Sequence, residues 1–141
     1  PAHRSRKSPQ TRIKVFAAMK IELSSEWTPT QNEFDLFAQI SGDDNPIHVD
    51  PELSARTRFG QTVAHGALLC AVLRGLVEEL VPGGRQIRQA TRYCAPSPVD
   101  QPLRFDAEMI AESGSAAKIR LQVMRLTDGV ITCSGETEVE A

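Results

Sequence analysis

Apolar and polar residues alternate along the last third of the chain, as they do in half-buried β-strands. Between residues 117 and 123, alanine, isoleucine, leucine and valine alternate with lysine, arginine and glutamine. Successive side chains of a strand face opposite sides of a sheet, so this segment has one buried face and one solvated face. Residues 131–139 alternate similarly, with Cys133 on the apolar side and Thr132 on the solvent side. The predicted strands are Arg85–Cys94, Leu103–Ala111, 117–123 and 131–139, with a hairpin turn at Thr127-Asp128-Gly129.

A short helix is predicted to begin after Thr30. Thr30 and Glu33 have the spacing of a capping box, in which each side chain hydrogen-bonds the backbone of the other residue. Apolar residues then recur on one helical face, and the helix is expected to end near Ser41-Gly42. The apolar residues of this face are Phe34, Phe37 and Ile40.

Two further helices are predicted downstream. Asp50-Pro51 is typical of a helix start, with an aspartate cap and a proline in the first turn, and this helix is expected to run to about Arg58. Gly66–Val81 is apolar almost all round until Arg74, and it ends before Pro82-Gly83-Gly84. A helix without a polar face for two turns must be surrounded by protein, so we expect it to be the central helix of the core.

The order of these elements indicates an α+β fold, an antiparallel sheet wrapped around a long central helix. Ile13–Met19 is a plausible first strand, and residues 1–12 are expected to form a flexible basic arm ahead of a single domain at 13–141. A transit-peptide remnant or a phosphate-binding tail is an alternative reading of that arm. The sheet would have free edges, so pairing with a second copy in a homodimer, or a higher oligomer of dimers, is expected.

Composition narrows the class of protein further. A chain of 141 residues suits one domain, and a formal net charge of -2 gives no reason to expect a nucleic-acid or membrane partner. The longest apolar run, Ala67–Leu73, is too short to span a bilayer. Three cysteines without close pairing favour a reduced, cytoplasmic chain, with Cys70 and Cys133 as small core residues and Cys94 the third.

Two side chains and a helix start could carry acid–base chemistry. Asp43 and His48 stand on either side of an Asn45-Pro46 turn, and Gly66 opens the long apolar helix a short way downstream. A carboxylate, an imidazole and free N–H groups at a helix N-terminus are the parts needed to move a proton to or from a carbon beside a polarised carbonyl.

These residues lie in a long motif that resembles a known family. Phe37-Ala-x-x-Ser-Gly-Asp-x-Asn-Pro-Ile-His-x-Asp50, followed by Phe59-Gly-x-x-Val-Ala-His-Gly66, resembles the MaoC-like (R)-specific enoyl-CoA hydratases of the hot-dog superfamily. The resemblance is strong over 34–80 and continues weakly through 92–99. It implies a hot-dog fold and a hydro-lyase of fatty acid metabolism that adds water to trans-2-enoyl thioesters of coenzyme A or acyl-carrier protein. It also implies that no metal or redox cofactor is used.

The resemblance assigns roles position by position. Asp43 and His48 match the catalytic pair, and Gly66 matches the residue whose backbone N–H faces the thioester oxygen, with His65 and Ala64 beside it in the substrate-binding segment. A carboxylate and an imidazole can hold one water between them, and Gly66 has no side chain to block the thioester. Which member of the pair is the base is not decided by the sequence.

Each residue also has a plainer interpretation. Asp43 could merely cap a turn, and His48 could be a buried, hydrogen-bonded histidine. Asp50 is better explained as a helix cap than as a catalytic group, and His65 is expected to fix loop geometry more than to line the pocket. Arg74 is expected to pair with Glu78 at i+4, and an arginine there departs from the hydratases, which tend to carry a small hydroxyl residue in this region.

Three other functions remain as rivals. An acyl-CoA thioesterase could use the same fold, and a non-catalytic subunit could bind acyl thioesters without reacting them. A metal oxygenase would use His48, Asp50 and His65 as a two-histidine, one-carboxylate site, but Asp50 already has a capping role.

Overall fold

A computed structural model describes residues 21–141. The predicted basic arm and the strand at Ile13–Met19 lie outside the described residues. The first described strand is β1, Glu22–Trp27, which the sequence analysis did not predict. Four of its six residues are exposed, because it is an edge strand whose outer face carries serine and glutamate. Trp27 at its end packs against Phe105, with ring centroids 6.3 Å apart.

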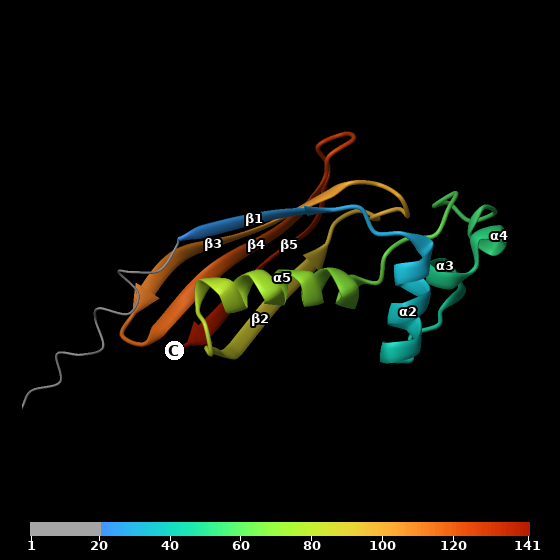
Figure 1. Cartoon of the computed structure of the whole chain (residues 1–141). Coiled ribbons are helices and arrows are strands. Elements are labelled where there is room, and N and C mark those ends of the chain that lie inside the picture. Colours follow the sequence, from blue (N-terminus) through green and yellow to red (C-terminus); the bar gives the residue numbers. More distant parts are fainter. Residues whose placement is uncertain (1–20) are drawn as a thin grey trace, which may run out of the picture.

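The predicted antiparallel sheet is confirmed (Figure 1). The four predicted strands correspond to β2 (Arg85–Tyr93), β3 (Leu103–Ser113), β4 (Ala116–Arg125) and β5 (Ile131–Glu140). All pairings among the five described strands are antiparallel, in the order β1-β3-β4-β5-β2. β1 and β2 are therefore the two edges of the described sheet.

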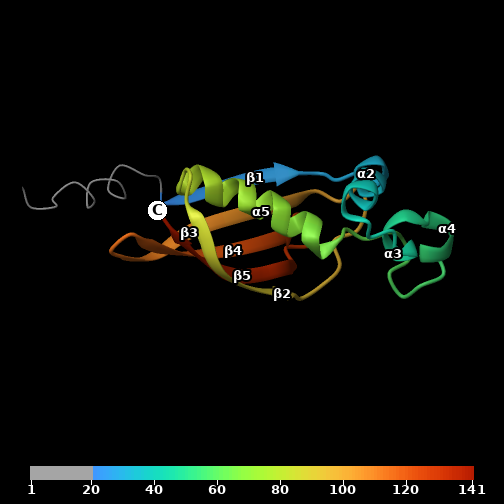
Figure 2. The same ribbon diagram turned by 90° about the horizontal axis from the view of Figure 1, so that it is seen from below.

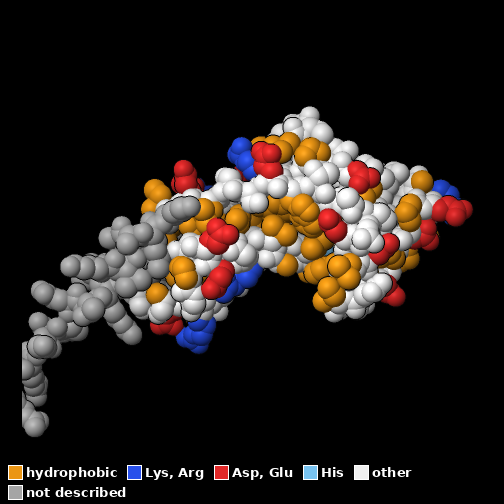
Figure 3. Space-filling view, in the orientation of Figure 1, with side chains coloured by type: hydrophobic (Ala, Val, Ile, Leu, Met, Phe, Trp, Pro, Cys, Tyr) orange, Lys and Arg blue, Asp and Glu red, His pale blue; other side chains and the backbone are white. Residues whose placement is uncertain are grey.

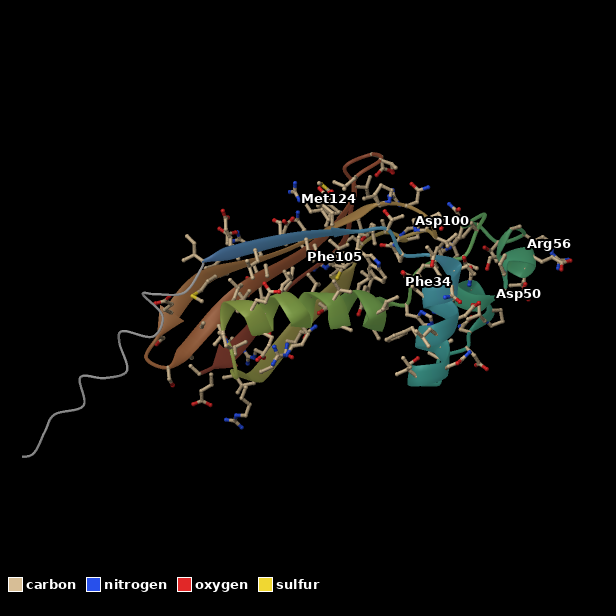
Figure 4. The ribbon with its side chains drawn as sticks, viewed as in Figure 1. Phe34, Asp50, Arg56, Asp100, Phe105 and Met124 are labelled. Atoms are coloured by element: carbon tan, nitrogen blue, oxygen red, sulfur yellow. The ribbon has the colours of Figure 1, made fainter. Side chains whose placement is uncertain are left out.

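The long helix α5, Gly66–Leu80, lies along one face of this sheet, as Figure 2 shows from below. Its buried leucine face packs on the inward residues of the sheet, and Figure 4 labels one of these, Phe105 of β3, between the sheet and α5. No part of residues 21–141 covers the other side of α5, where Ala67, Ala71 and Gly75 are exposed; the expectation that protein surrounds this helix therefore holds for its sheet side only within these residues. Figure 3, in the view with α5 below β1, shows hydrophobic side chains gathered in the middle of the molecule.

Three short helices form a separate layer beyond the end of the sheet where α5 begins (Figures 1 and 2). They are α2 (Gln31–Ser41), α3 (Pro46–Val49) and α4 (Pro51–Ser54). At the start of α2, the Glu33 carboxylate accepts from the Thr30 N–H at 3.1 Å, as the capping box predicts. Phe34 of α2, labelled in Figure 4, is the fully buried residue of this helix.

One prediction about this layer was wrong. The helix that starts at Asp50 ends at Ser54 and not near Arg58, because the Thr57 hydroxyl donates to the Ser54 carbonyl at 2.7 Å and accepts from the Phe59 N–H at 3.3 Å. Such local side-chain bonds compete with the helical ladder. The turn at Asn45 is the N-cap of the one-turn helix α3.

Two burial predictions also need correction. Thr132 was expected on the solvent side, but it is fully buried and its hydroxyl lies 2.8 Å from that of Ser97. The pairing of β4 with β5 shifts register next to this position, which breaks the simple alternation. Cys133 is buried as predicted, and burial raises the pKa of its thiol to about 12. Cys70 is half-buried and not a core residue. No helix in residues 21–141 is long and apolar enough to cross a membrane.

Candidate active site

His48 occupies the single turn α3, and its side chain is buried. Its Nδ1 lies 2.7 Å from the carbonyl oxygen of Val63. A carbonyl only accepts hydrogen bonds, so Nδ1 carries the proton of the neutral ring and Nε2 carries the lone pair. The Val63 N–H in turn donates to the Ile47 carbonyl at 3.0 Å, which ties α3 to the segment before α5. His48 is therefore held in one orientation, with a basic nitrogen free.

The carboxylate of Asp43 faces that free nitrogen. Oδ2 of Asp43 lies 3.8 Å from Nε2 of His48, and the Asp43 side chain is 52% exposed. The other oxygen, Oδ1, accepts from the Asn45 N–H at 3.3 Å, and the loop leaves α2 through Gly42 at φ 79°. One carboxylate oxygen thus holds the loop while the other faces His48. The structure brings together the two residues that the motif singled out.

His65 is buried directly beneath this pair and precedes the first residue of α5. Its ring stacks on that of His48 with centroids 3.9 Å apart, and Phe37 meets it edge-on. Nε2 lies 2.9 Å from the backbone carbonyl of Asp43, so this nitrogen carries the proton. Nδ1 is buried without a partner among the described residues. The expected structural role of His65 agrees with these contacts, which fasten the Asp43 loop to α5.

The electrostatic state of His65 follows from its position. Burial lowers the pKa of His65 below its ordinary 6.5, and the neighbouring His48 lowers it further. The hydrogen bond to the Asp43 carbonyl opposes this shift without reversing it. His65 is therefore a neutral ring at neutral pH, and it places no positive charge against His48.

Gly66 begins α5, and its N–H has no acceptor among the described residues. Free N–H groups and the positive end of the helix dipole meet at this point. The ring of Tyr93, at the end of β2, lies against Gly66, so a Cβ on Gly66 would lie 2.6 Å from Cζ of that ring. Tyr93 was not predicted as a site residue, although it lies within the predicted strand Arg85–Cys94.

A pocket of about 680 Å³ opens beside these groups. His48, Gly66 and Ala64 line one side of it, and Phe59 and Tyr93 line the rest together with the loop after β2. Most of the wall is apolar, with a smaller number of polar groups that include His48, Arg58 and Tyr93, which is the usual form of a site for a small organic ligand.

The remaining predicted residues lie outside the pocket. The Asp50 carboxylate accepts from the Leu53 N–H at 3.0 Å and caps α4, and Figure 4 places Asp50 in the outer layer, near Arg56. Arg74 pairs with Glu78 at 3.4 Å, as predicted, and also donates to the Gly84 carbonyl. Since Arg74 does not line the pocket, its departure from the hydratase pattern leaves the pocket wall unchanged.

Asp43, His48 and His65 also have the side chains of a possible metal site. Candidate ligand atoms of Asp43, His48 and His65 all lie within 4.8 Å of one another, whereas Asp50 is occupied as a cap. Imidazole binds a metal ion along its ring plane, and the two rings are stacked with planes 24° apart. Two stacked rings cannot both direct a lone pair at one ion, so the arrangement does not suit the metal oxygenase alternative.

Comparison with known proteins agrees with this geometry. A sequence profile described as "MaoC like domain" matches residues 13–132. The chain belongs to the MaoC-like family. A 3-hydroxyacyl-thioester dehydratase Z of Mycobacterium tuberculosis is 38% identical over 93 residues, covering 61% of this chain and 62% of that protein. An (R)-specific enoyl-CoA hydratase of Aeromonas caviae is 30% identical over 108 residues, covering 74% of this chain and 80% of that protein.

Solved structures confirm the hot-dog fold of this MaoC-like domain. The unliganded R-hydratase PhaJ1 of Pseudomonas aeruginosa superposes with a TM-score of 0.82 at 24% identity, covering 89% of this chain and 84% of that one. The (R)-hydratase of Aeromonas caviae superposes with a TM-score of 0.81 at 24% identity, covering 87% and 97%. At this level of identity the likeness concerns the fold.

Proposed function

We propose that the protein adds water reversibly to trans-2-enoyl thioesters, giving (R)-3-hydroxyacyl thioesters. One observation carries the proposal: Oδ2 of Asp43 and Nε2 of His48 face each other 3.8 Å apart, and His48 lines the same pocket as Gly66, the first residue of α5. The names of the relatives, a 3-hydroxyacyl-thioester dehydratase and an (R)-specific enoyl-CoA hydratase, support the same reaction in its two directions. The chain spans 62% of the Mycobacterium protein's length.

The pair is suited to hold one water molecule. The Asp43 carboxylate and the unprotonated Nε2 of His48 are both acceptors, and a gap of 3.8 Å between them is one that a bridging water can fill. That water donates one O–H to each acceptor. Its oxygen lone pair is then directed away from the pair, toward C3 of a thioester bound in the pocket.

The reaction balances with these groups alone. The water oxygen bonds to C3 while one water proton passes to the pair, and the π electrons of the C2–C3 bond move toward the thioester carbonyl. A proton from the pair then reaches C2, so H and OH have been added and the pair is restored. Dehydration runs the same steps in reverse. Positioned acid–base groups of this kind contribute about 10²–10⁴-fold to the rate.

The negative charge that develops on the thioester oxygen needs a fixed donor. The N–H of Gly66 and the positive end of the α5 dipole supply one, and neither must reorganise during the reaction. Ala64 and His65 immediately precede Gly66 and hold its place: the Ala64 N–H donates to the Ser97 carbonyl at 2.9 Å, and His65 is anchored to the Asp43 loop.

The proposal includes a homodimer. β1 and β2 each have an edge that no described strand covers, and on β2 the side chains of Ile87 and Tyr93 are largely exposed. A second copy that pairs with such an edge removes it from solvent. Light scattering of the purified protein should give twice the chain mass, and a monomer at concentrations where the protein is active would contradict this part.

The reaction itself is tested with crotonyl-CoA in deuterated water. We expect 3-hydroxybutyryl-CoA of R configuration, with one deuterium at C2 and no free thiol released. Release of coenzyme A at the rate of substrate loss would instead identify a thioesterase. Binding of acyl-CoA without turnover of any enoyl thioester would identify a non-catalytic binding subunit.

A further inference from the structure

Tyr93 stands where the thioester oxygen is expected to bind. Its ring lies against Gly66 and lines the same pocket as His48. The Tyr93 hydroxyl lies 3.0 Å from the position of a Cβ on Gly66. By ordinary bond geometry it is therefore within about 5.5 Å of the Gly66 nitrogen. At that separation a single thioester oxygen can accept one hydrogen bond from the Tyr93 hydroxyl and one from the Gly66 N–H.

The hydrogen bonds around Tyr93 leave its proton available. Nε2 of Gln89 donates to the Thr91 hydroxyl at 2.9 Å and to Sγ of Cys70 at 3.5 Å, and the oxygen of the same amide accepts from Gln86. Sγ of Cys70 lies 3.2 Å from the Tyr93 oxygen. Because Gln89 supplies a donor to the sulfur, the thiol S–H is free to donate to the Tyr93 oxygen. The Tyr93 O–H then points elsewhere.

We propose that the Tyr93 hydroxyl is a second hydrogen-bond donor to the thioester oxygen, beside the N–H of Gly66. This rests on the proposed hydration of enoyl thioesters. Burial raises the pKa of Tyr93 above its ordinary value, so the phenol keeps its proton. Cys70 and Gln89 act through Tyr93 and are positioning residues.

The decisive variant is Tyr93→Phe, which keeps the ring against Gly66 and removes the hydroxyl. Loss of one donor to a developing oxyanion lowers kcat about 10²–10³-fold, and we expect a loss near the lower end with KM changed less than about threefold. Cys70→Ala should lower kcat by less than tenfold, because Tyr93 keeps its own O–H. Arg88→Gln changes an exposed side chain of β2 outside this network and is the control, with activity unchanged.

A spectroscopic measurement separates donation from structure. A trans-2-enoyl thioester bound to Asp43→Asn should show its carbonyl stretch shifted to lower frequency, and adding Tyr93→Phe should remove part of that shift. Full kcat in Tyr93→Phe, while Asp43→Asn is inactive, overturns the role of Tyr93 and leaves the proposed function standing. A wild-type protein that hydrates no enoyl thioester overturns both.

Discussion

Replacing Gly66 with alanine should separate stability from activity. An added Cβ would lie 2.6 and 2.7 Å from two ring carbons of Tyr93 and 3.0 Å from its hydroxyl oxygen. Carbon atoms in ordinary contact are about 3.5–4.0 Å apart, so the ring must withdraw by roughly 1 Å. The atoms that clash are the far end of a side chain that is 55% exposed, so the ring can move.

The added methyl group has two opposite effects on the free energy of unfolding, overpacking against Tyr93 and the removal of a glycine from a helix, and these nearly cancel. Overpacking costs about 1–3 kcal/mol in a tight core, and the low end applies to a ring that can swing outward. Alanine in place of glycine in a helix returns about 0.5–1 kcal/mol. We therefore expect the free energy of unfolding of Gly66→Ala to lie within about 1 kcal/mol of the wild-type value. Its hydratase activity should fall about 10²-fold or more, because the methyl group and the displaced hydroxyl disturb the oxyanion contact.

Chemical denaturation and the enoyl-CoA hydration rate measure the two effects on the same preparation. Gly75→Ala is the matched control, because it lies on the same helix and an added Cβ meets nothing within 4 Å. The free energy of unfolding of Gly75→Ala should rise by about 0.5–1 kcal/mol, and its hydration activity should be unchanged. A Gly66→Ala protein that is fully active, or one that loses more than about 3 kcal/mol, would refute the reasoning.

Three further outcomes follow from buried polar groups. Thr132→Val should cost about 1–3 kcal/mol in denaturant unfolding because it leaves the buried Ser97 hydroxyl unpaired, and adding Ser97→Ala should recover part of that loss. The free energy of unfolding should fall as the pH drops below about 6.5, because His65 binds a proton more readily in the unfolded chain than in the folded one. The variant His65→Gln should reduce this dependence of the free energy of unfolding on pH. An equal pH dependence in the variant and in wild type would contradict the role of His65. Iodoacetamide should label the exposed Cys94 in the native protein and Cys133 only after unfolding, since burial raises the pKa of the Cys133 thiol to about 12.

The strands of the sheet's C-terminal half could be predicted because one face of each is buried. In the middle of β4 the inward positions are apolar and the outward ones, Lys118, Arg120 and Gln122, are polar, which gives a period of two that needs no tertiary information. β1 has no such signal. Its residues Ser24 and Ser25 are exposed, and the strand is held by pairing with β3, a long-range contact that the local sequence does not carry.

The catalytic pair could be predicted and its surroundings could not. Asp43 and His48 are close in the sequence, so a short sequence motif contains both residues and their spacing. The stacking of His65 on His48 joins segments 17 residues apart, and the contact of Tyr93 with Gly66 joins residues 27 apart. Such contacts depend on the packing of α5 beside β2, which the pattern of either segment alone does not determine.

The most direct test of the account is the initial rate of crotonyl-CoA hydration, followed by loss of enone absorbance, in wild type and in Asp43→Asn and His48→Gln. Asp44→Asn is the matched control, because Asp44 is an exposed carboxylate next in sequence. We expect Asp43→Asn and His48→Gln each to lose about 10²–10⁴-fold in rate, with the double variant little worse than either and Asp44→Asn fully active. An active wild type whose Asp43→Asn and His48→Gln variants both keep the full rate would contradict the proposed site.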